Sequence, residues 1–441
     1  MRDALIDLGE VPSGGPGETE TALPRAPLPY RWILGLLTAL LVVLLGGGGP
    51  PPQPPPGPVV LPITLGDGIR TGDGRLYVIG QAEPIGTVIR TYAIQAYDLP
   101  AVTPAGVYRV TVSGDVFSVV DAGDGLLLVS YNDNESATLG LMAVRPGGGA
   151  PVWRRAANLF GISADHAMAL VQEESLPGRP ENHNVWRALD PRTGQVRWSV
   201  EQPVDGQLTM APGFYSAGFP PRFYVVHGDG RVVTHDALTG APVGGVRLPR
   251  PLAEDSVIWV AGGLLLAGYG DDETIAYDAL TLTERWRADG GILPEEGYAQ
   301  SCEPMVCVAA IVQGLTGFDP ATGRRLWRSA GYDSSEVIDG HVLIARASQS
   351  EPALAVLDPS TGRTTEVPGF WTSGGPGPSP GTAWVYRLQA VGYELRYGVL
   401  DLATGRVRLL GHAEWITGDC RFTTGVLICR RADSTVAVWR L

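Results

Sequence analysis

The phrase Ala188-Leu-Asp-Pro-Arg-Thr-Gly194 returns, with small changes, along most of this 441-residue chain. Three other plain copies are Gly317-Phe-Asp-Pro-Ala-Thr-Gly323, Val356-Leu-Asp-Pro-Ser-Thr-Gly362 and Val399-Leu-Asp-Leu-Ala-Thr-Gly405. With weaker copies there are eight, whose pivot positions are 39 to 47 residues apart, at Asp98, Arg145, Asp190, Asp236, Asp278, Asp319, Asp358 and Asp401. A period of about 40–45 residues with strand-like content indicates a β-propeller, in which each repeat forms one sheet.

The phrase has the chemistry of a tight turn between two strands. Apolar runs such as Arg222–Val226 and His341–Ala345 precede it and have the composition of buried strands. An aspartate bonds its own backbone two residues on, a proline presets φ, and a glycine supplies a left-handed residue. A ligand role is the alternative, but one site does not need the same residue in nearly every repeat. We therefore predict turn caps at Asp190, Asp236, Asp278, Asp319, Asp358 and Asp401.

A tryptophan often follows the turn on the next predicted strand. A large flat indole buries much area when it packs between two sheets. We predict this packing role, rather than a stack on a cofactor, for Trp153, Trp198, Trp286 and Trp327.

Both Ala188–Trp198 and Phe318–Trp327 contain Asp-x-x-Thr-Gly followed within four residues by Trp. This pattern resembles the pyrroloquinoline-quinone (PQQ)-type propeller repeat of quinoprotein dehydrogenases and of the outer-membrane assembly lipoprotein propeller of Gram-negative bacteria. The resemblance covers roughly residues 59–441. It implies the propeller fold and says little about cofactor or activity, because one fold hosts many functions.

The number of blades is harder to predict than the fold. The sequence contains nine strand hairpins, and the last one ends at Leu441 without a turn phrase or an outer strand. Closure by pairing with the N-terminal segment Pro58–Leu65 would complete the ring. Since propellers usually have about 4–8 blades, we expect an all-β, eight-bladed propeller of four-stranded blades in which one terminal unit is merged or irregular.

Four segments are expected along the chain: a disordered tail at 1–29, a transmembrane signal-anchor helix at 30–49, a Pro-rich linker at 50–58 and the propeller at 59–441. The tail is polar and rich in Gly, Pro and Glu. The helix prediction depends on an apolar run that reaches the roughly 20 residues of a span only when its flanks are included. A cleaved signal peptide is the alternative, but it needs a short basic start and a small-residue cleavage site.

Arginines flank only one side of the predicted membrane segment. Arg25 and Arg31 precede it, and the next basic residue after it is Arg70. The positive-inside rule then predicts a single-pass protein of the cell membrane, with a cytoplasmic N-terminus and an extracytoplasmic propeller.

The chain has four cysteines, and both pairs fall in the same part of the repeat. In an exported domain this placement predicts two local disulfides, Cys302–Cys307 and Cys420–Cys429. A zinc site is the alternative, but zinc favours spacings such as Cys-x2-Cys with histidines nearby, and these do not fit.

Motifs of known chemistry are missing from the sequence. It contains no Gly-x-Ser-x-Gly elbow, P-loop or His-Glu-x-x-His. His227 and His235 are expected on opposite arms of one hairpin with Asp229 at its tip, where they could meet as a metal pair. The acidic tips Asn132–Glu135 and Asp271–Glu273 offer oxygen ligands for calcium. Ordinary strand and turn roles explain all of them. We expect no catalytic, cofactor-binding or metal-binding residue, and no cofactor.

Composition and the resemblance narrow the function. A net charge of −13 argues against nucleic acid as a partner, since binding it requires a basic face. Quinoprotein dehydrogenases carry adjacent cysteines beneath the cofactor, and this chain has no Cys-Cys pair. We expect a non-enzymatic, membrane-anchored scaffold that binds an envelope protein or polymer. A PQQ-dependent dehydrogenase and a ligand sensor signalling through the single helix are the alternatives.

Overall fold

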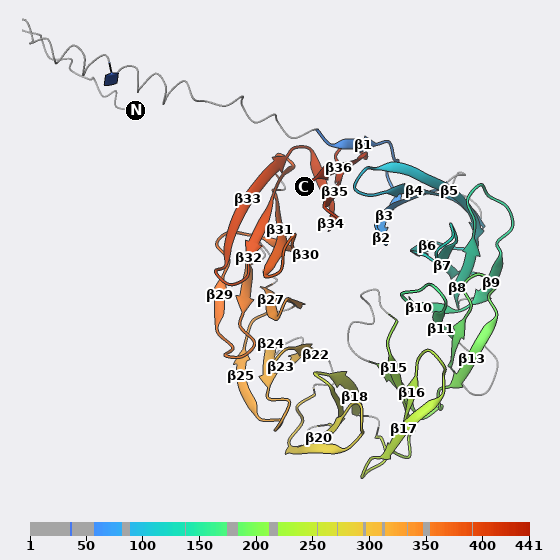
Figure 1. The fold of residues 1–441 in the computed structure, drawn as a ribbon, viewed down its shortest axis with the longest axis vertical. Coiled ribbons are helices and arrows are strands. Elements are labelled where there is room, and N and C mark those ends of the chain that lie inside the picture. The colour runs from blue at the N-terminus through green and yellow to red at the C-terminus, as the bar shows by residue number, and fades with distance from the viewer. Residues whose placement is uncertain are drawn as a thin grey trace, which may run out of the picture. The chain divides into compact units, whose positions relative to one another are not determined.

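Strand-forming runs and Gly- and Asp-rich turns alternate along the chain, and they build a ring of radial sheets (Figure 1). This computed structural model describes residues 36–37, 57–81, 89–136, 138–173, 184–210, 219–253, 255–270, 272–293, 297–310, 314–332, 334–346, 353–389 and 391–441. The chain divides into two units, Met1–Pro56 and Gly57–Leu441. The ring lies entirely in the second unit.

Most of the predicted N-terminal segments lie outside the described residues. This holds for the tail at 1–29, for residues 50–56 of the linker, and for the membrane segment at 30–49 except Leu36 and Leu37. Among the residues that are described, no helix has the length and apolar character needed to cross a bilayer.

Each of the first four blades is a meander of four antiparallel strands, ordered from the centre of the ring outward. Their strands are β2 Gly68–Gly72, β3 Arg75–Gln81, β4 Arg90–Asp98 and β5 Thr103–Val112; β6 Val116–Asp121, β7 Leu127–Asp133, β8 Thr138–Val144 and β9 Trp153–Ala156; β10 Asn158–Ile162, β11 Ala169–Glu173, β12 Val185–Leu189 and β13 Val196–Glu201; β14 Gln207–Met210, β15 Arg222–Val226, β16 Arg231–Asp236 and β17 Pro242–Arg247.

The remaining blades follow the same order, and the ninth takes its outer strand from the start of the chain. Their strands are β18 Ser256–Ala261, β19 Leu264–Tyr269, β20 Glu273–Asp278 and β21 Glu284–Asp289; β22 Gly297–Cys302, β23 Met305–Ala310, β24 Gly314–Phe318 and β25 Arg325–Ser329; β26 Ser334–Ile338, β27 His341–Arg346, β28 Ala353–Leu357 and β29 Thr364–Glu366; β30 Thr372–Pro376, β31 Thr382–Gln389, β32 Glu394–Asp401 and β33 Arg406–Ala413; β34 Ile416–Thr423, β35 Val426–Arg431, β36 Val436–Arg440 and β1 Val59–Leu61.

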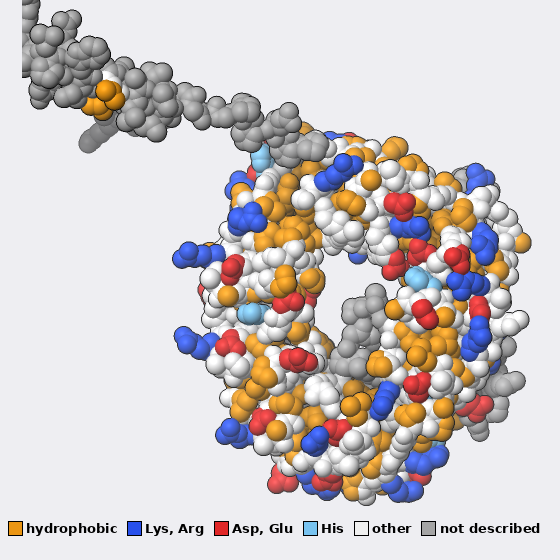
Figure 2. All heavy atoms as spheres, viewed as in Figure 1, with side chains coloured by type: hydrophobic (Ala, Val, Ile, Leu, Met, Phe, Trp, Pro, Cys, Tyr) orange, Lys and Arg blue, Asp and Glu red, His pale blue; other side chains and the backbone are white. Residues whose placement is uncertain are grey.

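The expectation of eight blades is wrong. Within the described residues, the strands form nine separate four-stranded sheets. The last hairpin is not merged into a neighbour, because β1 pairs with β36 and completes a sheet of its own. The expected closure is therefore correct, and it adds a blade: Val59 lies opposite Val438 and Leu61 opposite Val436. Figure 1 shows β1 beside β36, and Figure 2 shows the opening that the ring surrounds.

The meander gives the ring two different faces. In blades 1 to 8, the turns between first and second strands and between third and fourth strands lie at one face, which we call the turn face. The turns between second and third strands and the connections to the next blade lie at the other, the connection face. Since β36 is a third strand and β1 a fourth strand, Leu441 and Val59 both lie at the turn face.

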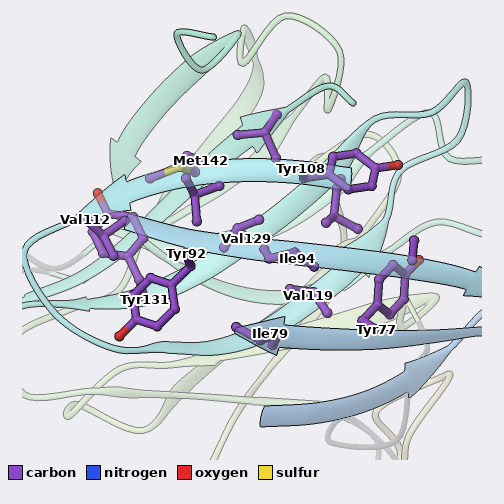
Figure 3. Packing of buried hydrophobic residues seen from close by; sticks show 14 residues of the cluster. Tyr77, Ile79, Tyr92, Ile94, Tyr108, Val112, Val119, Val129, Tyr131 and Met142 are labelled. Carbon is purple, nitrogen blue, oxygen red and sulfur yellow. The ribbon is translucent and has the colours of Figure 1, made fainter. Parts of the chain in front are cut away.

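Apolar residues from neighbouring sheets form the core between blades. Figure 3 shows the cluster between blades 1 and 2, in which Tyr77, Ile94 and Val129 are fully buried. The side chain of Tyr131 lies flat over Gly140 on the adjacent strand, where a Cβ atom would come within 2.1 Å of the ring. This buried aromatic ring thus needs a glycine opposite it.

The outer-strand tryptophans pack against the next blade. Each indole covers the glycine that ends the neighbouring turn phrase, in the pairs Trp153 on Gly194, Trp198 on Gly240, Trp286 on Gly323 and Trp327 on Gly362. In three pairs the indole Nε1 also donates to a proline carbonyl oxygen of that turn, at 2.8, 2.8 and 2.7 Å, namely Pro191, Pro320 and Pro359. Trp198 instead stacks on Phe223 with ring centroids 5.4 Å apart.

One boundary uses a different solution. Blade 4 has Gly244 where other outer strands carry the tryptophan, and a Cβ atom there would meet nothing within 4 Å. The next turn has Leu282 in place of the glycine, with φ of 56°. Leu282 is buried in the same apolar cluster as Tyr277, and Val246 packs against that cluster. The leucine fills the boundary from the opposite side, at the cost of a left-handed backbone that disfavours side chains.

We predict that the tryptophan contact, rather than backbone strain alone, makes the turn glycine necessary. Gly323 and Gly263 have similar φ values of 69° and 73°. A Cβ atom added at Gly323 would lie 2.5 Å from the indole of Trp286, whereas one added at Gly263 would meet nothing within 4 Å. Gly263→Ala should cost about 1 kcal/mol of unfolding free energy from strain. Gly323→Ala should cost about 1–3 kcal/mol more, because the indole must move.

Urea denaturation of residues 57–441, which contain all the strands of the ring, measures both variants. Equal losses for the two substitutions would show that the indole contact contributes nothing beyond the turn itself.

Candidate functional site

The predicted turn aspartates all bond their own turns. Asp236 shows the pattern: its Oδ1 accepts hydrogen bonds from the backbone N–H of Leu238 at 3.1 Å and of Thr239 at 2.8 Å. Corresponding backbone bonds reach the carboxylates of Asp190, Asp278, Asp319, Asp358 and Asp401. Each of these aspartates lies on its own blade at the turn face, so the ring does not bring them together into one site.

Asp278 is the most strongly stabilised of these carboxylates. A hydrogen bond from Arg285 Nη2 at 2.6 Å and one from the backbone N–H of Thr281 at 2.8 Å hold the pKa of Asp278 well below its usual range. Asp190 has the same arginine seven residues on, Arg197, at 2.5 Å. Burial opposes ionisation of Asp190, but these bonds outweigh it and lower its pKa. The negative charges of Asp278 and Asp190 therefore stabilise their own turns.

The cysteines form the two predicted disulfides, Cys302–Cys307 and Cys420–Cys429. Each bond joins the first and second strands of one blade, the sixth and the ninth. Three of the four cysteines are fully buried. The two disulfides each crosslink one hairpin, and their sulfur atoms are therefore not available as thiolate ligands for a metal ion.

The histidine pair does not meet. His227 lies before β16 at the connection face, with its Nδ1 3.1 Å from Arg231 Nη2. His235 lies near the other end of that strand, where its Nδ1 is 2.9 Å from the carbonyl oxygen of Gly240.

The first acidic tip bonds its own loop. Asp133, in the first tip, accepts hydrogen bonds from Ser113 and from the backbone N–H of Glu135. In the second tip, Asp271 lies outside the described residues. Across the part of the chain that the structure describes, no group of three or more His, Cys, Asp or Glu side chains is placed to hold a metal ion.

A hollow of about 650 Å³ lies over the inner strands β2, β6 and β10 of the first three blades. Two of its charged groups, Arg70 and Asp121, form bonds within the fold. Arg70 donates to the backbone carbonyl oxygens of Phe117 at 3.0 Å and Ile69 at 2.8 Å. Asp121 accepts from Arg75, which also bonds Asp98 at 2.8 Å and so joins blades 1 and 2. These bonds hold the blades together. Asp73 and His166 also line the hollow, and His166 Nδ1 is buried without a hydrogen-bond partner among the described residues.

The connection face carries exposed apolar side chains on consecutive blades. They are between 41% and 93% exposed and lie from the entry of blade 8 to the entry of blade 1. We call them the apolar arc: Phe370, Val391, Tyr393, Trp415 and Leu65. Single exposed apolar residues are ordinary on a protein surface, but exposed aromatic residues gathered on one set of loops are typical of a binding surface.

Two aromatic residues of the arc are held in an uncommon backbone conformation. Tyr393 has φ of 52° and Trp415 has φ of 63°. The carbonyl oxygen of Tyr393 accepts from the N–H of Ile416 at 2.8 Å, and that of Trp415 accepts from the N–H of Ala432 at 2.7 Å. The first of these bonds places the two loops side by side. A left-handed conformation in bulky residues is costly and concentrates at functional sites.

Two ion pairs lie on the strands next to these aromatic residues, β32, β34 and β35. Arg396 bonds Glu394 at 2.8 Å, and Arg430 bonds Asp419 at 2.9 Å. Arg396 holds the pKa of Glu394 below its usual range. An apolar centre with a charged border is the usual anatomy of a protein–protein interface.

Sequence reasoning did not find the apolar arc. Trp415 is the only described tryptophan with more than half of its surface exposed. It lies outside the repeat position of the packing tryptophans, in the connection between β33 and β34. A tryptophan outside the packing position of the repeat was therefore the sequence feature that could have indicated an exposed aromatic residue.

The family comparison agrees with the repeat pattern. The family model described as outer membrane protein assembly factor BamB matches residues 181–363 and 228–436, which together span more than half of the chain. The chain belongs to this PQQ-type propeller family. No curated protein matches the chain.

Solved structures resemble it only distantly. BamB from Moraxella catarrhalis is 17% identical, with 74% of this chain and 96% of that chain covered and a TM-score of 0.38. The computationally designed Ika8 protein is 13% identical, with 85% and 95% covered and a TM-score of 0.36. The C-terminal WD40 domain of Sif2 is 11% identical, with 87% and 98% covered and a TM-score of 0.39. Likenesses at this level say nothing of what the chain binds.

We predict that Asp278 stabilises the folded ring in a pH-dependent way. Its folded-state pKa is lowered, so its contribution is fully present above the unfolded value of about 3.9 and is lost as the pH falls below it. Asp278→Asn should therefore unfold more easily than the parent at pH 7, and the difference should shrink toward zero as the pH falls from about 5 toward 2.

Asp289→Asn is the control, because Asp289 is exposed and makes no ion pair with any described residue. Thermal unfolding across this pH range compares the three proteins. A constant difference between parent and Asp278→Asn at every pH would contradict the prediction.

Proposed function

We propose that this protein is a membrane-tethered, extracytoplasmic binding module that docks an envelope protein on its apolar arc. The arrangement of Trp415 and Tyr393 carries the proposal. Both are exposed aromatic side chains on loops whose backbones are bonded into the ring. Rigid aromatic anchors lose little conformational entropy on binding, and they dominate binding free energy at interfaces.

The chemistry of the chain supports binding rather than catalysis. Arg70 and Asp121 in the described hollow bond neighbouring backbone and side chains, and the turn carboxylates cap their own turns. The family name, outer membrane protein assembly factor, describes a role in assembling other proteins. We propose a scaffold role of the same general kind for this chain, with no cofactor.

Two features support an extracytoplasmic location. Disulfides persist in oxidising compartments and are rare in the cytosol, and the ring contains two. The arginines before residues 30–49, with none after them until Arg70, favour a cytoplasmic N-terminus.

The topology is tested by mild protease treatment of intact cells that carry an epitope tag at each end of the protein. We expect loss of the C-terminal tag and protection of the N-terminal tag. Full protection of both tags, with cleavage of both after the cells are opened, would contradict the extracytoplasmic location.

The binding surface is tested by a photo-crosslinking residue at position 415 in the full-length protein in membranes. Position 204 is the matched control, since Val204 is also exposed at the connection face, between β13 and β14. We expect one discrete protein crosslinked at position 415 and none at position 204.

With that partner purified, Trp415→Ala should raise the Kd about 30-fold, the effect of removing a hot-spot side chain of about 2 kcal/mol. Val204→Ala should change it by less than about twofold. Similar effects of the two substitutions would contradict the assignment. Capture of a glycan instead of a protein would replace the protein partner with an envelope polymer.

A further inference from the structure

The outer edge of blades 6 to 8 is basic although the protein as a whole is acidic. In each of these blades we consider the segment from the residue after the turn glycine to the end of the outer strand: 324–329, 363–366 and 406–413. In these three segments there are six arginines and one glutamate: Arg324, Arg325, Arg328, Arg363, Arg406, Arg408 and Glu366. The chain has a net charge of −13. Positive charge is therefore concentrated on one part of the rim, where Figure 2 shows arginine side chains projecting over β25, β29 and β33.

On blades 3 to 5 the outer-strand arginines are neutralised. Arg197, Arg285 and Arg287 pair with Asp190, Asp278 and Glu284 at 2.5, 2.6 and 3.1 Å, and Arg247 lies 3.5 Å from Asp229. Arg325 and Arg408 differ, since neither forms an ion pair with a described residue. Both are exposed. Their guanidinium groups are available to an external anion.

Apolar side chains lie beside these arginines. Leu326 follows Arg325 on β25, and Leu409 and Leu410 follow Arg408 on β33. On the outer strand of blade 9, Val60 is also exposed. These four side chains are between 37% and 55% exposed. We call Arg325, Leu326, Arg408, Leu409, Leu410 and Val60 the rim patch. Arginine with exposed leucine is typical of surfaces that lie in the membrane–water interface.

The chain enters the ring at this part of the rim. Its first strand, β1, is the outer strand of blade 9, and blade 9 packs against blade 8 through contacts of β34 with β30 and β31. Only residues 50–58 separate it from the proposed membrane segment. These few residues reach about 30 Å even when extended. A tether of this length keeps the adjoining blades near the membrane surface.

We infer that the rim patch binds the anionic phospholipid surface of the membrane in which the protein is anchored. The inference rests on the proposed tethering of the ring. Arginine guanidinium groups suit phosphate, which they bind with two hydrogen bonds, and each basic residue at an anionic surface adds to the attraction. The leucines and Val60 meet the boundary between headgroups and acyl chains.

Vesicle sedimentation of residues 57–441 tests the inference without the anchor. This fragment contains every strand and closes its own ring. We expect it to bind vesicles of phosphatidylcholine with one-third phosphatidylglycerol, and not vesicles of phosphatidylcholine alone. Raising the salt concentration should release it, because ions screen exposed charges.

Charge reversal locates the surface. Arg325→Glu with Arg408→Glu should weaken vesicle binding by about tenfold or more. Arg109→Glu with Arg247→Glu is the matched control, since it makes the same change in net charge on the outer strands β5 and β17. The control should stay within about threefold of the parent, and thermal unfolding should show that both variants fold.

The inference would be overturned by equal weakening by the two charge reversals, by no difference between the two vesicle compositions, or by no vesicle binding by the parent fragment. Binding to soluble inorganic polyphosphate but not to vesicles would assign the rim patch to a soluble polyanion and would overturn it as well. Trp415→Ala should leave vesicle binding unchanged. The crosslink at position 415 therefore tests partner binding at the apolar arc, and the vesicle assay separately tests lipid binding at the rim patch.

Discussion

The contact between an outer-strand tryptophan and the turn glycine of the next blade joins neighbouring sheets at four described blade boundaries. The indole can lie there only because the glycine has no Cβ atom, as at Gly194 beneath Trp153. The glycine keeps its left-handed backbone because the carbonyl oxygen of the aspartate four residues earlier accepts its N–H, at 2.8 Å in the case of Asp190. Aspartate, glycine and tryptophan therefore depend on one another across a blade boundary, and the repeated phrase is a packing device between sheets.

The ring does not need the same contact at every boundary. Between blades 4 and 5 the tryptophan and the glycine are both absent, and Leu282 fills the space from the turn side. Between blades 1 and 2, buried tyrosines such as Tyr77 and Tyr131 form the packing instead. Each solution buries apolar surface at the same place, and dense packing requires a shape-matched neighbour for each. A propeller can therefore lose its sequence signature in some blades and keep its geometry.

Because packing differs between blade boundaries, the sequence predicts some features of the ring and not others. Turn caps, disulfides and closure are local or pattern-based features, and residues such as Asp236 and Cys302 show them directly. The expected blade number was wrong because it followed the usual range of about 4–8 blades rather than the nine hairpins in the sequence. The strand Val59–Leu61 pairs with the far end of the chain and completes a ninth sheet. The apolar arc was not predicted because a tryptophan packs or projects according to its place in the ring. Trp327 is partly buried against the next blade, whereas Trp415 is exposed on a loop.

The first strand of the chain is the outer strand of blade 9. This placement affects how a tethered ring can be oriented relative to the membrane. The chain enters through β1, the outermost strand of blade 9, so its entry lies at the rim of the turn face. If the rim patch lies on the membrane, the ring stands on its edge, and neither face is covered by lipid. The apolar arc lies on the connection face, and both ends of the ring's chain lie at the turn face. An edge-on ring would leave Trp415 open to a partner approaching along the membrane, whereas a ring lying on its connection face would bury it.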